Sequence, residues 1–545
     1  MLSAGRGFAQ SQADHNFEIS KNLDIFNSAY RELELYYVDS LNAKKNIETA
    51  LVYMLNQFDP YTEYYADDNL SELKQITTGK YGGIGALIQY RPSLKRCVVA
   101  EPYAHTPAAE AGLHAGDVLL SIDGRDYGDC DGTNTAAYSN EVSGSLRGDL
   151  GTTFELRVRR HGFAEPLAFR ITRRTISLPS VQLDTVLQDS VGYICLSSYN
   201  ENTAHELKLA LARVKQLGAK RLILDLRGNP GGLLDQAVKV VGMFVPRGKE
   251  VVRLKGKIKR ENTVYHTEDA PLDTQIPLVV LVDFNTASSA EITSGALQDY
   301  DRAVIVGRNT YGKGLVQEAR QLPYGAILKL TTSKYYIPSG RCIQAYRYQN
   351  GMPVHLSDSV SAEFHTAAGR SVRDGGGIRP DVEVKLDSLP LLISYLEVSD
   401  ALMDFCSDYQ LHHPTIASPD TFSLSAEEYC EFRQFLKDHG FTYDSQSRTA
   451  LQTLRRIADM EGYTEVASEA FAALEDKLSK NEDFDFTRWE SDIRQVVEGA
   501  LLSRYYYQRG TQVYALRADK DLSEALRLIC DDARYRSILA APAGK

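Results

Sequence analysis

Between Ile176 and Val384 the chain alternates apolar runs of strand length with stretches of helical pattern. The runs Leu222–Leu224 and Leu278–Val282 contain no polar residue, which is typical of strands buried on both faces. Strands of this kind are covered by the helices that connect them, so the alternation predicts a mostly parallel sheet with helices packed against it. We expect this segment, residues 176–384, to be the catalytic core.

The chain on either side of this core has other patterns, which divide its 545 residues into further regions. Residues 17–75 carry apolar positions at helical spacing, and residues 76–175 consist of short β-rich runs between Gly, Pro and Asp turns. Residues 385–545 are helical in pattern to the end, and residues 1–16 resemble either the tail of a secretory signal or a short disordered terminus. The expected fold class is multidomain α+β, with helical regions at both ends.

The composition excludes several classes of function. There are 61 Lys and Arg against 72 Asp and Glu, a net charge of −11, and the basic residues are scattered, so no nucleic-acid surface is expected. No apolar stretch is long enough to span a bilayer, so no transmembrane segment is expected. The seven cysteines show neither a disulfide framework nor zinc-site spacing, and no metal or cofactor is expected.

A glycine-rich loop, Gly82–Ala86, precedes an apolar strand in the β-rich region. Its backbone amides can converge on an anion, although a glycine hairpin without a ligand would have the same residues. The longer string Thr106–Gly124 resembles the PDZ domain of bacterial proteases, and Leu146–Thr152 fits the helix and turn that close such a domain. The resemblance implies that a peptide adds a strand beside Ile84–Ile88 while the loop holds its terminal carboxylate. The residues implied in peptide binding are Gly83, Ile84, Gly85 and Ala86.

Two strand–loop–helix crossovers of the core place unpaired backbone amides at a helix N-terminus, where the helix dipole favours negative charge. In the first, Gly231 and Gly232 permit the backbone to approach a reacting group closely. In the second, Ser288 lies where an alkoxide would be stabilised. Taken alone, the second crossover favours an ordinary helix cap built from Thr286, Ser288 and Glu291.

The segment Gly307–Gln317 favours chemistry instead, because it places Lys313 between two glycines directly after an apolar strand. If the ammonium of Lys313 were buried near a serine, desolvation would lower its pKa from about 10.4 toward ~7–8. The neutral amine would then serve as a general base. Gln317, four residues further on, is suited to hold the amine by a hydrogen bond without adding a charge that would keep it protonated.

The spacing of these residues is similar to that of the C-terminal processing peptidases, also called tail-specific proteases. Ser288-Ser289-Ala290-Glu291 is followed by Lys313 after 25 residues and by Gln317 after 29. The resemblance covers Phe17 to Val384 and implies a PDZ domain before a crotonase-like α/β core. Further strings of the family are present at Asp225–Gly232, Tyr335–Arg341 and Gly376–Val382.

The same resemblance implies a role for each site residue. Ser288 is the implied nucleophile, Lys313 the general base and Gln317 the residue that orients the lysine. An oxyanion hole formed by backbone amides would stabilise the tetrahedral intermediate. The implied donors are the amide of Ser289 and that of Gly231 or Gly232.

The implied function is a serine endopeptidase that recognises protein C-terminal tails through a PDZ domain and cleaves peptide bonds by way of an acyl-enzyme. Its partners would be proteins or peptides with accessible C-termini. The family, together with the signal-like N-terminus, implies export to the periplasm or cell envelope of a Gram-negative bacterium. The C-terminal helices favour a packed cap, with a homodimer contact or an adaptor surface as the alternative.

Three other functions fit parts of the sequence. A non-catalytic PDZ and crotonase-like protein that binds or sequesters tails would not need the complete Ser-Lys-Gln set, and an acyl-CoA enzyme on the same core would have no use for a PDZ domain. A Ser-His-Asp triad would use Asp225 with His205 or His266, yet no spacing supports it. Arg227 is instead expected to brace the glycine loop with a carboxylate. Glu291 fits both a cap and a loop contact and is not assigned to the catalytic set.

Overall fold

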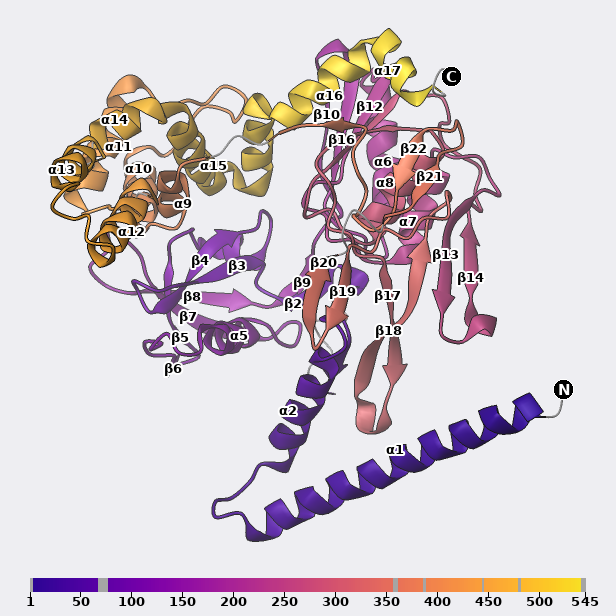
Figure 1. Cartoon of the computed structure of the whole chain (residues 1–545). Helices are drawn as coiled ribbons and strands as arrows, with labels where there is room; N and C mark the ends of the chain where they lie inside the picture. Colours follow the sequence, from indigo (N-terminus) through magenta and orange to yellow (C-terminus); the bar gives the residue numbers. More distant parts are fainter. Residues whose placement is uncertain are drawn as a thin grey trace. The chain divides into compact units, whose positions relative to one another are not determined.

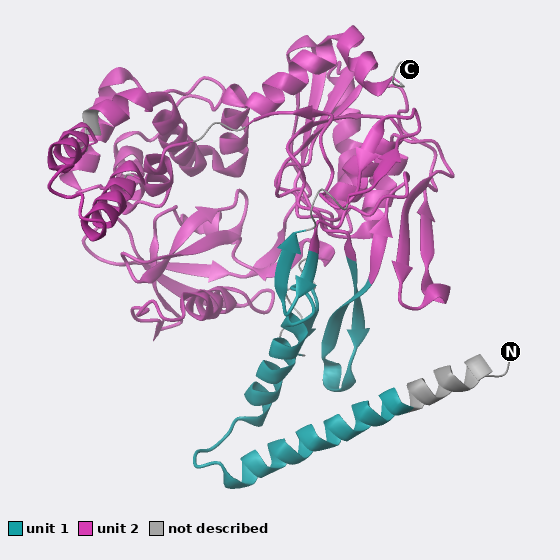
Figure 2. Ribbon diagram, in the orientation of Figure 1, with its two compact units in different colours: residues 1–70, 316–332, 347–355 teal, residues 71–315, 333–346, 356–545 magenta. Residues whose placement is uncertain are grey.

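The computed structural model of the chain describes residues 3–66, 77–355, 361–385, 389–443, 446–478 and 482–540. The chain divides into two compact units (Figure 2). Unit 1 comprises residues 1–70, 316–332 and 347–355, and unit 2 comprises residues 71–315, 333–346 and 356–545.

This division differs from the order of regions along the sequence. The segment expected to be the catalytic core, residues 176–384, contributes two of its pieces to unit 1. Within the described residues, no helix is both long enough and apolar enough to cross a membrane. All seven cysteines are present as free thiols.

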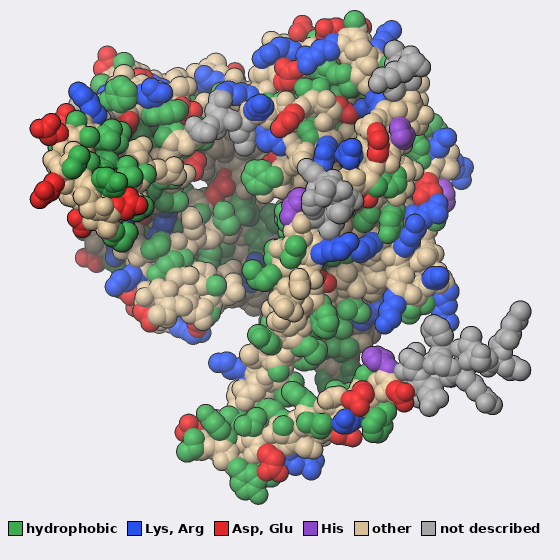
Figure 3. Space-filling model, viewed as in Figure 1, with side chains coloured by type: hydrophobic (Ala, Val, Ile, Leu, Met, Phe, Trp, Pro, Cys, Tyr) green, Lys and Arg blue, Asp and Glu red, His purple; other side chains and the backbone are tan. Residues whose placement is uncertain are grey.

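Unit 1 contains long helices and β-hairpins (Figure 1). Its first helix begins at Ser3, so residues 1–16, expected to be a signal remnant or a disordered terminus, are helical from the third residue. Hydrophobic side chains along this helix are exposed (Figure 3). The elements, some of which begin or end in unit 2, are α1 (Ser3–Tyr36), α2 (Ala43–Asn56), β1 (Glu63–Tyr65), β17 (Leu315–Gln321), η4 (Pro323–Gly325), β18 (Ile327–Tyr336), β19 (Tyr346–Gln349) and β20 (Met352–His355).

The β-rich region of unit 2 folds as a small sheet with short helices. Its strands pair in the order β3-β4-β5-β7-β8, with β6 beside β5, so β3 lies at an edge of the sheet. Strands β2 and β9 pair where the region joins the rest of unit 2. The elements are β2 (Lys80–Gly83), β3 (Ala86–Arg91), β4 (Arg96–Pro102), α4 (Pro107–Ala111), β5 (Val118–Ile122), β6 (Arg125–Asp126), α5 (Thr135–Leu146), β7 (Thr153–Arg159), β8 (Leu167–Thr172) and β9 (Arg174–Ser177).

The core of unit 2 is a six-stranded sheet in the order β10-β11-β12-β15-β16-β23 (Figure 1). Strands β10 and β11 are antiparallel and each later neighbouring pair is parallel, so the predicted mostly parallel sheet is confirmed. The carboxyl ends of parallel strands share one edge, and the loops with the predicted chemistry leave from it. The strands are β10 (Val181–Leu187), β11 (Val191–Leu196), β12 (Arg221–Asp225), β15 (Leu278–Val282), β16 (Val304–Gly307) and β23 (Val382–Glu383).

Helices cover both faces of this sheet. Leu281 of β15 and Val306 of β16 belong to the apolar cluster that includes Leu522 of α16. On the opposite face, a Cβ at Gly192 of β11 would lie 3.1 Å from Val214 of α6. The helices and short turns of the core are η2 (Gln188–Ser190), α6 (Thr203–Gln216), α7 (Leu234–Gly242), α8 (Ser289–Asp299), α16 (Lys520–Cys530) and α17 (Asp532–Leu539).

The remaining elements of unit 2 are a smaller sheet, a hairpin and the C-terminal helices. Trp489 and Tyr506 pack, partly buried, against the apolar core of these helices, as they would in a packed cap. The strands are β13 (Glu250–Gly256), β14 (Thr263–His266), β21 (Glu363–His365) and β22 (Ser371–Arg373), with η3 (Lys259–Glu261). The helices are α9 (Leu391–Glu397), α10 (Asp400–His412), α11 (Ala426–Asp438), α12 (Gln446–Met460), α13 (Ser468–Lys477), α14 (Glu482–Arg488), α15 (Glu490–Ala515) and η6 (Leu516–Ala518).

Candidate active site

Ser288 lies at the turn between β15 and α8, where it is the N-cap residue of the helix. Its backbone has φ 55° and ψ −118°, a combination that glycine adopts readily and other residues adopt only under strain. Strain of this kind costs on the order of 1–3 kcal/mol and clusters at functional sites. Ser289 is only 1% exposed, and its hydroxyl donates to Gly232 O at 2.8 Å. The strained and more accessible serine is therefore Ser288.

Glu291, on the first turn of α8, joins the serine turn to the lysine loop. Its side chain is fully buried, and Oε2 accepts hydrogen bonds from the backbone N of Ser288 at 2.8 Å and of Lys313 at 2.9 Å. Oε1 accepts from Gly312 N at 2.8 Å and from the Thr310 hydroxyl at 2.5 Å. One carboxylate thus holds two chain segments. The sequence offered a cap and a loop contact as alternatives for Glu291, and the structure shows both.

Burial raises the pKa of Glu291 from its usual value of 4.5 to about 7, although its hydrogen bonds counteract part of the increase. Because the pKa is higher in the folded state, the folded protein binds more protons than the unfolded chain between pH 4.5 and about 7. The stability contributed by this group is complete below pH 4.5 and is lost as the pH rises through about 7. The loss is on the order of 3 kcal/mol.

Replacing Glu291 with glutamine is expected to remove this part of the pH dependence, because the amide does not titrate. The measurement is the free energy of unfolding from urea titrations at about pH 5 and about pH 8. The difference between the two pH values should be smaller in Glu291→Gln than in the wild type. Asp235→Asn is the control, because Asp235 is an exposed carboxylate paired with Lys239 on α7. The same pH dependence in Glu291→Gln and the wild type would contradict the assignment.

The glycine loop after β12 packs directly on the serine turn. Gly231 has φ +93°, and a Cβ at this position would lie 2.8 Å from both Ser288 Cβ and Ser289 N. The Thr286 hydroxyl, expected to cap α8, donates instead to Leu226 O at 2.9 Å and ties the two loops together. The predicted close approach of the glycine backbone is therefore made to the serine turn itself.

The amides expected to form the oxyanion hole differ in their hydrogen bonding. Ser289 is the first residue of α8, and amides of the first helical turn have no acceptor within their own helix. Gly231 N donates to Asn229 Oδ1 at 2.8 Å, so this amide is occupied. Gly232 forms a parallel bridge with Tyr199, in which Tyr199 N donates to Gly231 O and Tyr199 O accepts from the residue after Gly232. The bridge does not use Gly232 N.

Lys313 lies half-buried in the loop between β16 and β17. The Tyr335 hydroxyl lies 2.5 Å from Lys313 O and 3.3 Å from Ser288 O, which gives the two segments a second link. The preceding Gly312 has φ +85°, and a Cβ there would lie 2.3 Å from Ala345 Cβ. A glycine beside the lysine is thus required both by the backbone conformation and by packing.

The predicted site residues do not all belong to one unit. Gln317 lies on β17 in unit 1, where its Nε2 donates to Thr331 Oγ1 of β18 at 3.1 Å. Unit 2 brings the serine turn, the glycine loop and the lysine loop together through the contacts described above. The predicted residues in these three segments are Ser288, Ser289, Gly231, Gly232 and Lys313.

The Ser-His-Asp alternative finds no support in the contacts of its acid. Asp225 accepts a hydrogen bond from the Tyr193 hydroxyl at 2.7 Å and pairs with Arg227 at 2.6 Å. His205 on α6 and His266 on β14 are both exposed. The Asp225 carboxylate is therefore engaged in bracing the root of the glycine loop, as expected for Arg227 and a carboxylate.

The loop expected to bind a peptide carboxylate is held by the start of α4. Gly85 O accepts hydrogen bonds from Tyr103 N at 2.8 Å and from the Thr106 hydroxyl at 2.9 Å, and Ile84 O accepts from Ala108 N at 2.9 Å. Gly85 has φ +76°, and a Cβ there would lie 2.4 Å from Thr106 Cβ. These bonds fix the loop carbonyls beside β3, the edge strand.

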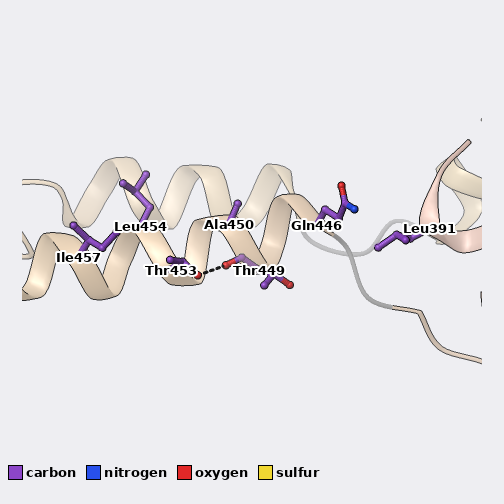
Figure 4. Close-up of a pocket in the computed structure, with 7 residues that line it drawn as sticks. All are labelled: Leu391, Gln446, Thr449, Ala450, Thr453, Leu454 and Ile457. Atoms are coloured by element: carbon purple, nitrogen blue, oxygen red, sulfur yellow. Dashed lines mark hydrogen bonds between the residues drawn. The ribbon is translucent and has the colours of Figure 1, made fainter. Parts of the chain in front are cut away.

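A groove of about 490 Å³ lies elsewhere in unit 2, along α12 (Figure 4). None of the residues that line it is a predicted site residue, and none carries a titratable side chain. The groove is therefore not the candidate active site. Its lining residues are Leu391, Gln446, Thr449, Ala450, Thr453, Leu454 and Ile457.

Family models match three parts of the chain. The model described as "Peptidase family S41" matches residues 190–354, and that described as "PDZ domain" matches residues 98–160. A third, described as "Probable PDZ-protease, C-terminal helical domain", matches residues 392–529. The matched ranges include most of the core strands, part of the small β domain and most of the C-terminal helices, and the first range extends into unit 1.

Curated proteins and solved structures are similar to the chain as well. A carboxy-terminal-processing protease from Bartonella bacilliformis is 33% identical over 341 residues, which is 62% of this chain and 76% of that protein. A carboxyl-terminal-processing protease from Synechocystis sp. is 37% identical over 309 residues, 56% of this chain and 70% of that protein. The structure of a photosystem II D1 C-terminal processing protease is 27% identical, covers 66% of this chain and 87% of that one, and has a TM-score of 0.36.

Proposed function

Since the chain belongs to peptidase family S41, whose carboxy-terminal-processing members are serine proteases, we propose that it cleaves peptide bonds with Ser288 as nucleophile and Lys313 as general base. The observation that carries this proposal is the shared carboxylate of Glu291, because the amides of both residues donate to its Oε2. The position of Ser288 at the N-terminus of α8 supports it further, since the helix dipole favours the negative charge that develops there.

The proposed acylation begins when neutral Lys313 Nζ takes the proton of Ser288 Oγ as this oxygen attacks the carbonyl carbon of the substrate. Collapse of the tetrahedral intermediate breaks the carbon–nitrogen bond. The proton on Lys313 then moves to the leaving amine, and the acyl group stays on Ser288 as an ester. In deacylation a water molecule attacks the ester, and Lys313 accepts one proton from the water and returns it to Ser288 Oγ. The product leaves as a carboxylic acid, which releases its remaining proton to solvent.

The proposed oxyanion hole consists of Ser289 N and Gly232 N, because Gly231 N already donates to Asn229 Oδ1. The role of Gln317 in orienting Lys313 is proposed from the sequence alone, in which it follows the lysine by four residues. We also propose that the core has a crotonase-like fold, which agrees with the mostly parallel sheet that lies between helices in this core.

A PDZ domain suggests binding of peptide C-termini, and we propose that this domain selects the substrates. The bound tail would extend the sheet at the free edge of β3, with its carboxylate at the loop formed by Gly83, Ile84, Gly85 and Ala86. The alternative, a non-catalytic tail-binding protein, is less favoured, because it would not require the strained serine beside the lysine loop.

We also propose, from the signal-like residues 1–16, that the protein is located in the periplasm or cell envelope. A homodimer contact or an adaptor surface at the C-terminal helices is likewise proposed from the sequence of those helices.

The experiment that tests this function compares the rates at which two substrates are cleaved. One is an unstructured protein whose apolar C-terminus is free, and the other is the same protein with its C-terminus amidated. We expect the full-length chain to cleave the free-tail substrate about tenfold faster, because the amide removes the charge that the loop amides bind. Cleavage products are located by mass spectrometry. Equal cleavage of both substrates would overturn the PDZ role, and tight tail binding without any cleavage would favour the sequestering protein.

Two glycine variants provide a matched comparison for the loop. In Gly85→Ala the new Cβ would lie 2.4 Å from Thr106 Cβ, so we expect the preference for the free tail to be lost. Gly124 has nearly the same conformation, with φ +77° against +76° at Gly85, but a Cβ there meets nothing within 4 Å. Gly124→Ala should therefore keep the preference.

A further inference from the structure

Helix α16 covers one face of the core sheet, although it begins more than 130 residues after the core segment ends. Leu522, Ala525 and Leu528 of α16 belong to the same apolar cluster as Leu281 of β15 and Val306 of β16. Asp519 caps the helix by accepting a hydrogen bond from Leu522 N at 2.9 Å. The packing of this helix holds its first turn at the carboxyl edge of the sheet, as the ion pairs of that turn show.

Asp521, in the first turn of α16, binds two arginines that follow different strands. Its Oδ1 and Oδ2 accept hydrogen bonds from Arg308 Nη1 at 2.9 Å and Nη2 at 2.8 Å, in the forked geometry that favours strong pairing. Oδ2 also accepts from Arg227 Nη1 at 3.0 Å. Asp519 pairs with Arg227 at 2.6 Å. The Asp521 side chain is only 6% exposed, so its ion pairs are poorly screened by solvent.

The two arginines stand at the roots of the two loops of the proposed active site. Arg227 follows β12 directly ahead of the glycine loop, and its N donates to Asp225 Oδ1 at 2.9 Å. Arg308 follows β16 ahead of the lysine loop, and its N donates to Val282 O at 3.1 Å. Strand β15 lies between β12 and β16 in the sheet and leads to Ser288. The Asp521 carboxylate therefore connects the loops on either side of the serine strand.

We propose that Asp521 is a positioning residue for the peptidase reaction, which sets the separation of the glycine loop from the lysine loop on either side of Ser288. The C-terminal helices thereby complete an active site whose reacting groups all lie in the core. Without the carboxylate, Arg227 would keep its ion pairs with Asp225 and Asp519, whereas Arg308 would lose its forked pair with α16. The link between the two loop roots would then be broken, and the root of the lysine loop would shift relative to that of the glycine loop. The proposal rests on the proposed function, because it assigns a role in that reaction.

The test measures steady-state kinetics of the full-length chain on a quenched-fluorescent peptide, with active sites counted by titration with a fluorophosphonate. We expect Asp521→Asn to lower kcat at least about tenfold while KM changes less than about twofold. Asp521→Glu keeps the charge and should hold kcat within about threefold of the wild type. The control is Asp532→Asn on α17, whose carboxylate pairs with Arg221 at 3.3 Å at the opposite end of β12. This variant should keep both constants.

A purely structural role would lower the number of active sites or the melting temperature and leave kcat per active site unchanged. That result in Asp521→Asn, or an equal loss of kcat in Asp532→Asn, overturns the proposal. If Asp521→Asn does not fold, Arg308→Gln, which removes the forked pair at the root of the lysine loop, is expected to lower kcat at least about tenfold with KM changed less than about twofold. A kcat per active site equal to that of the wild type in Arg308→Gln then overturns the proposal.

Hydrogen exchange separates this inference from the proposed function. We expect faster amide exchange in residues 228–232 and 309–314 of Asp521→Asn and unchanged exchange in β12, whether or not the protein cleaves a substrate. Unchanged exchange in both loops overturns the positioning role. An inactive wild type with the expected exchange pattern would contradict the proposed function alone.

Discussion

Ser288→Ala and Lys313→Ala are each expected to lower kcat/KM at least about 10⁴-fold, so that cleavage of the free-tail substrate is no longer detected. The first variant lacks the oxygen that forms the acyl-enzyme, and the second lacks the amine that takes its proton. Because the two groups act in the same step, the double variant should be no worse than the more severe single variant. Mass spectrometry of the products after long incubation is the measurement.

Ser289→Ala is the matched control for the choice of nucleophile. Its hydroxyl donates to Gly232 O and is buried, whereas the proposed function uses only the backbone amide of Ser289. We expect this variant to retain activity within about tenfold of the wild type. Loss of activity in Ser289→Ala together with full activity in Ser288→Ala would reverse the assignment of the two serines.

Ser288→Gly tests independently whether the backbone is strained at this position. It should be as inactive as Ser288→Ala and yet more stable by about 1 kcal/mol, because glycine adopts φ 55° without a steric penalty. Thermal unfolding of the two inactive variants measures the difference. A glycine variant less stable than the alanine variant would show that the turn is not strained.

Gly231→Ala is expected to lower kcat by about 10²–10³-fold, the effect of losing an oxyanion-hole donor. The new Cβ would lie 2.7 Å from Ala287 O and 2.8 Å from both Ser288 Cβ and Ser289 N, all closer than such atoms approach. The glycine loop must therefore move away from the serine turn, which separates the two proposed donors. Initial rates at saturating substrate, divided by the concentration of titrated active sites, measure kcat.

Gly228→Ala is the matched control in the same loop. Gly228 has φ +68°, so alanine is strained there too, but its Cβ meets nothing within 4 Å. We expect a loss of stability of about 1 kcal/mol with kcat kept within about threefold. A similar loss of kcat in both variants would mean that backbone strain, rather than the contact with Ser288, limits the reaction.

The sequence predicted those parts of the protein that depend on local pattern. Strand β15 was expected at Leu278–Val282 and lies there, because a run of five apolar residues suits a strand buried on both faces. A helix was expected directly after Ser288, and α8 begins at Ser289. The peptidase family was recognised from the serine and lysine spacing, and the PDZ domain from one glycine-containing string; the family models agree with both.

Other features could not be predicted from local pattern. The apolar spacing of residues 17–75 did not extend to residues 1–16, yet α1 begins at Ser3. The linear order of regions gave no sign that residues 316–332 and 347–355 belong to the same unit as the N-terminal helices. A helix closing the PDZ domain was expected only at Leu146, from the resemblance, whereas α5 spans Thr135–Leu146, whose sequence has only a weak apolar periodicity.

What the sequence determined by itself is the set of chemical groups and their order along the chain: a PDZ domain, then a serine at a helix N-terminus, then a lysine between glycines. The tertiary structure decided which carboxylates hold these groups in place. Glu291 binds the amide of Lys313, 22 residues away, as well as that of Ser288, and Asp521 binds an arginine 213 residues away. A buried carboxylate requires hydrogen-bond donors to offset its desolvation. The sequence does not show which of its acidic residues is buried beside the donors of these loops. Only the packing of α8 and α16 on the sheet selects these two.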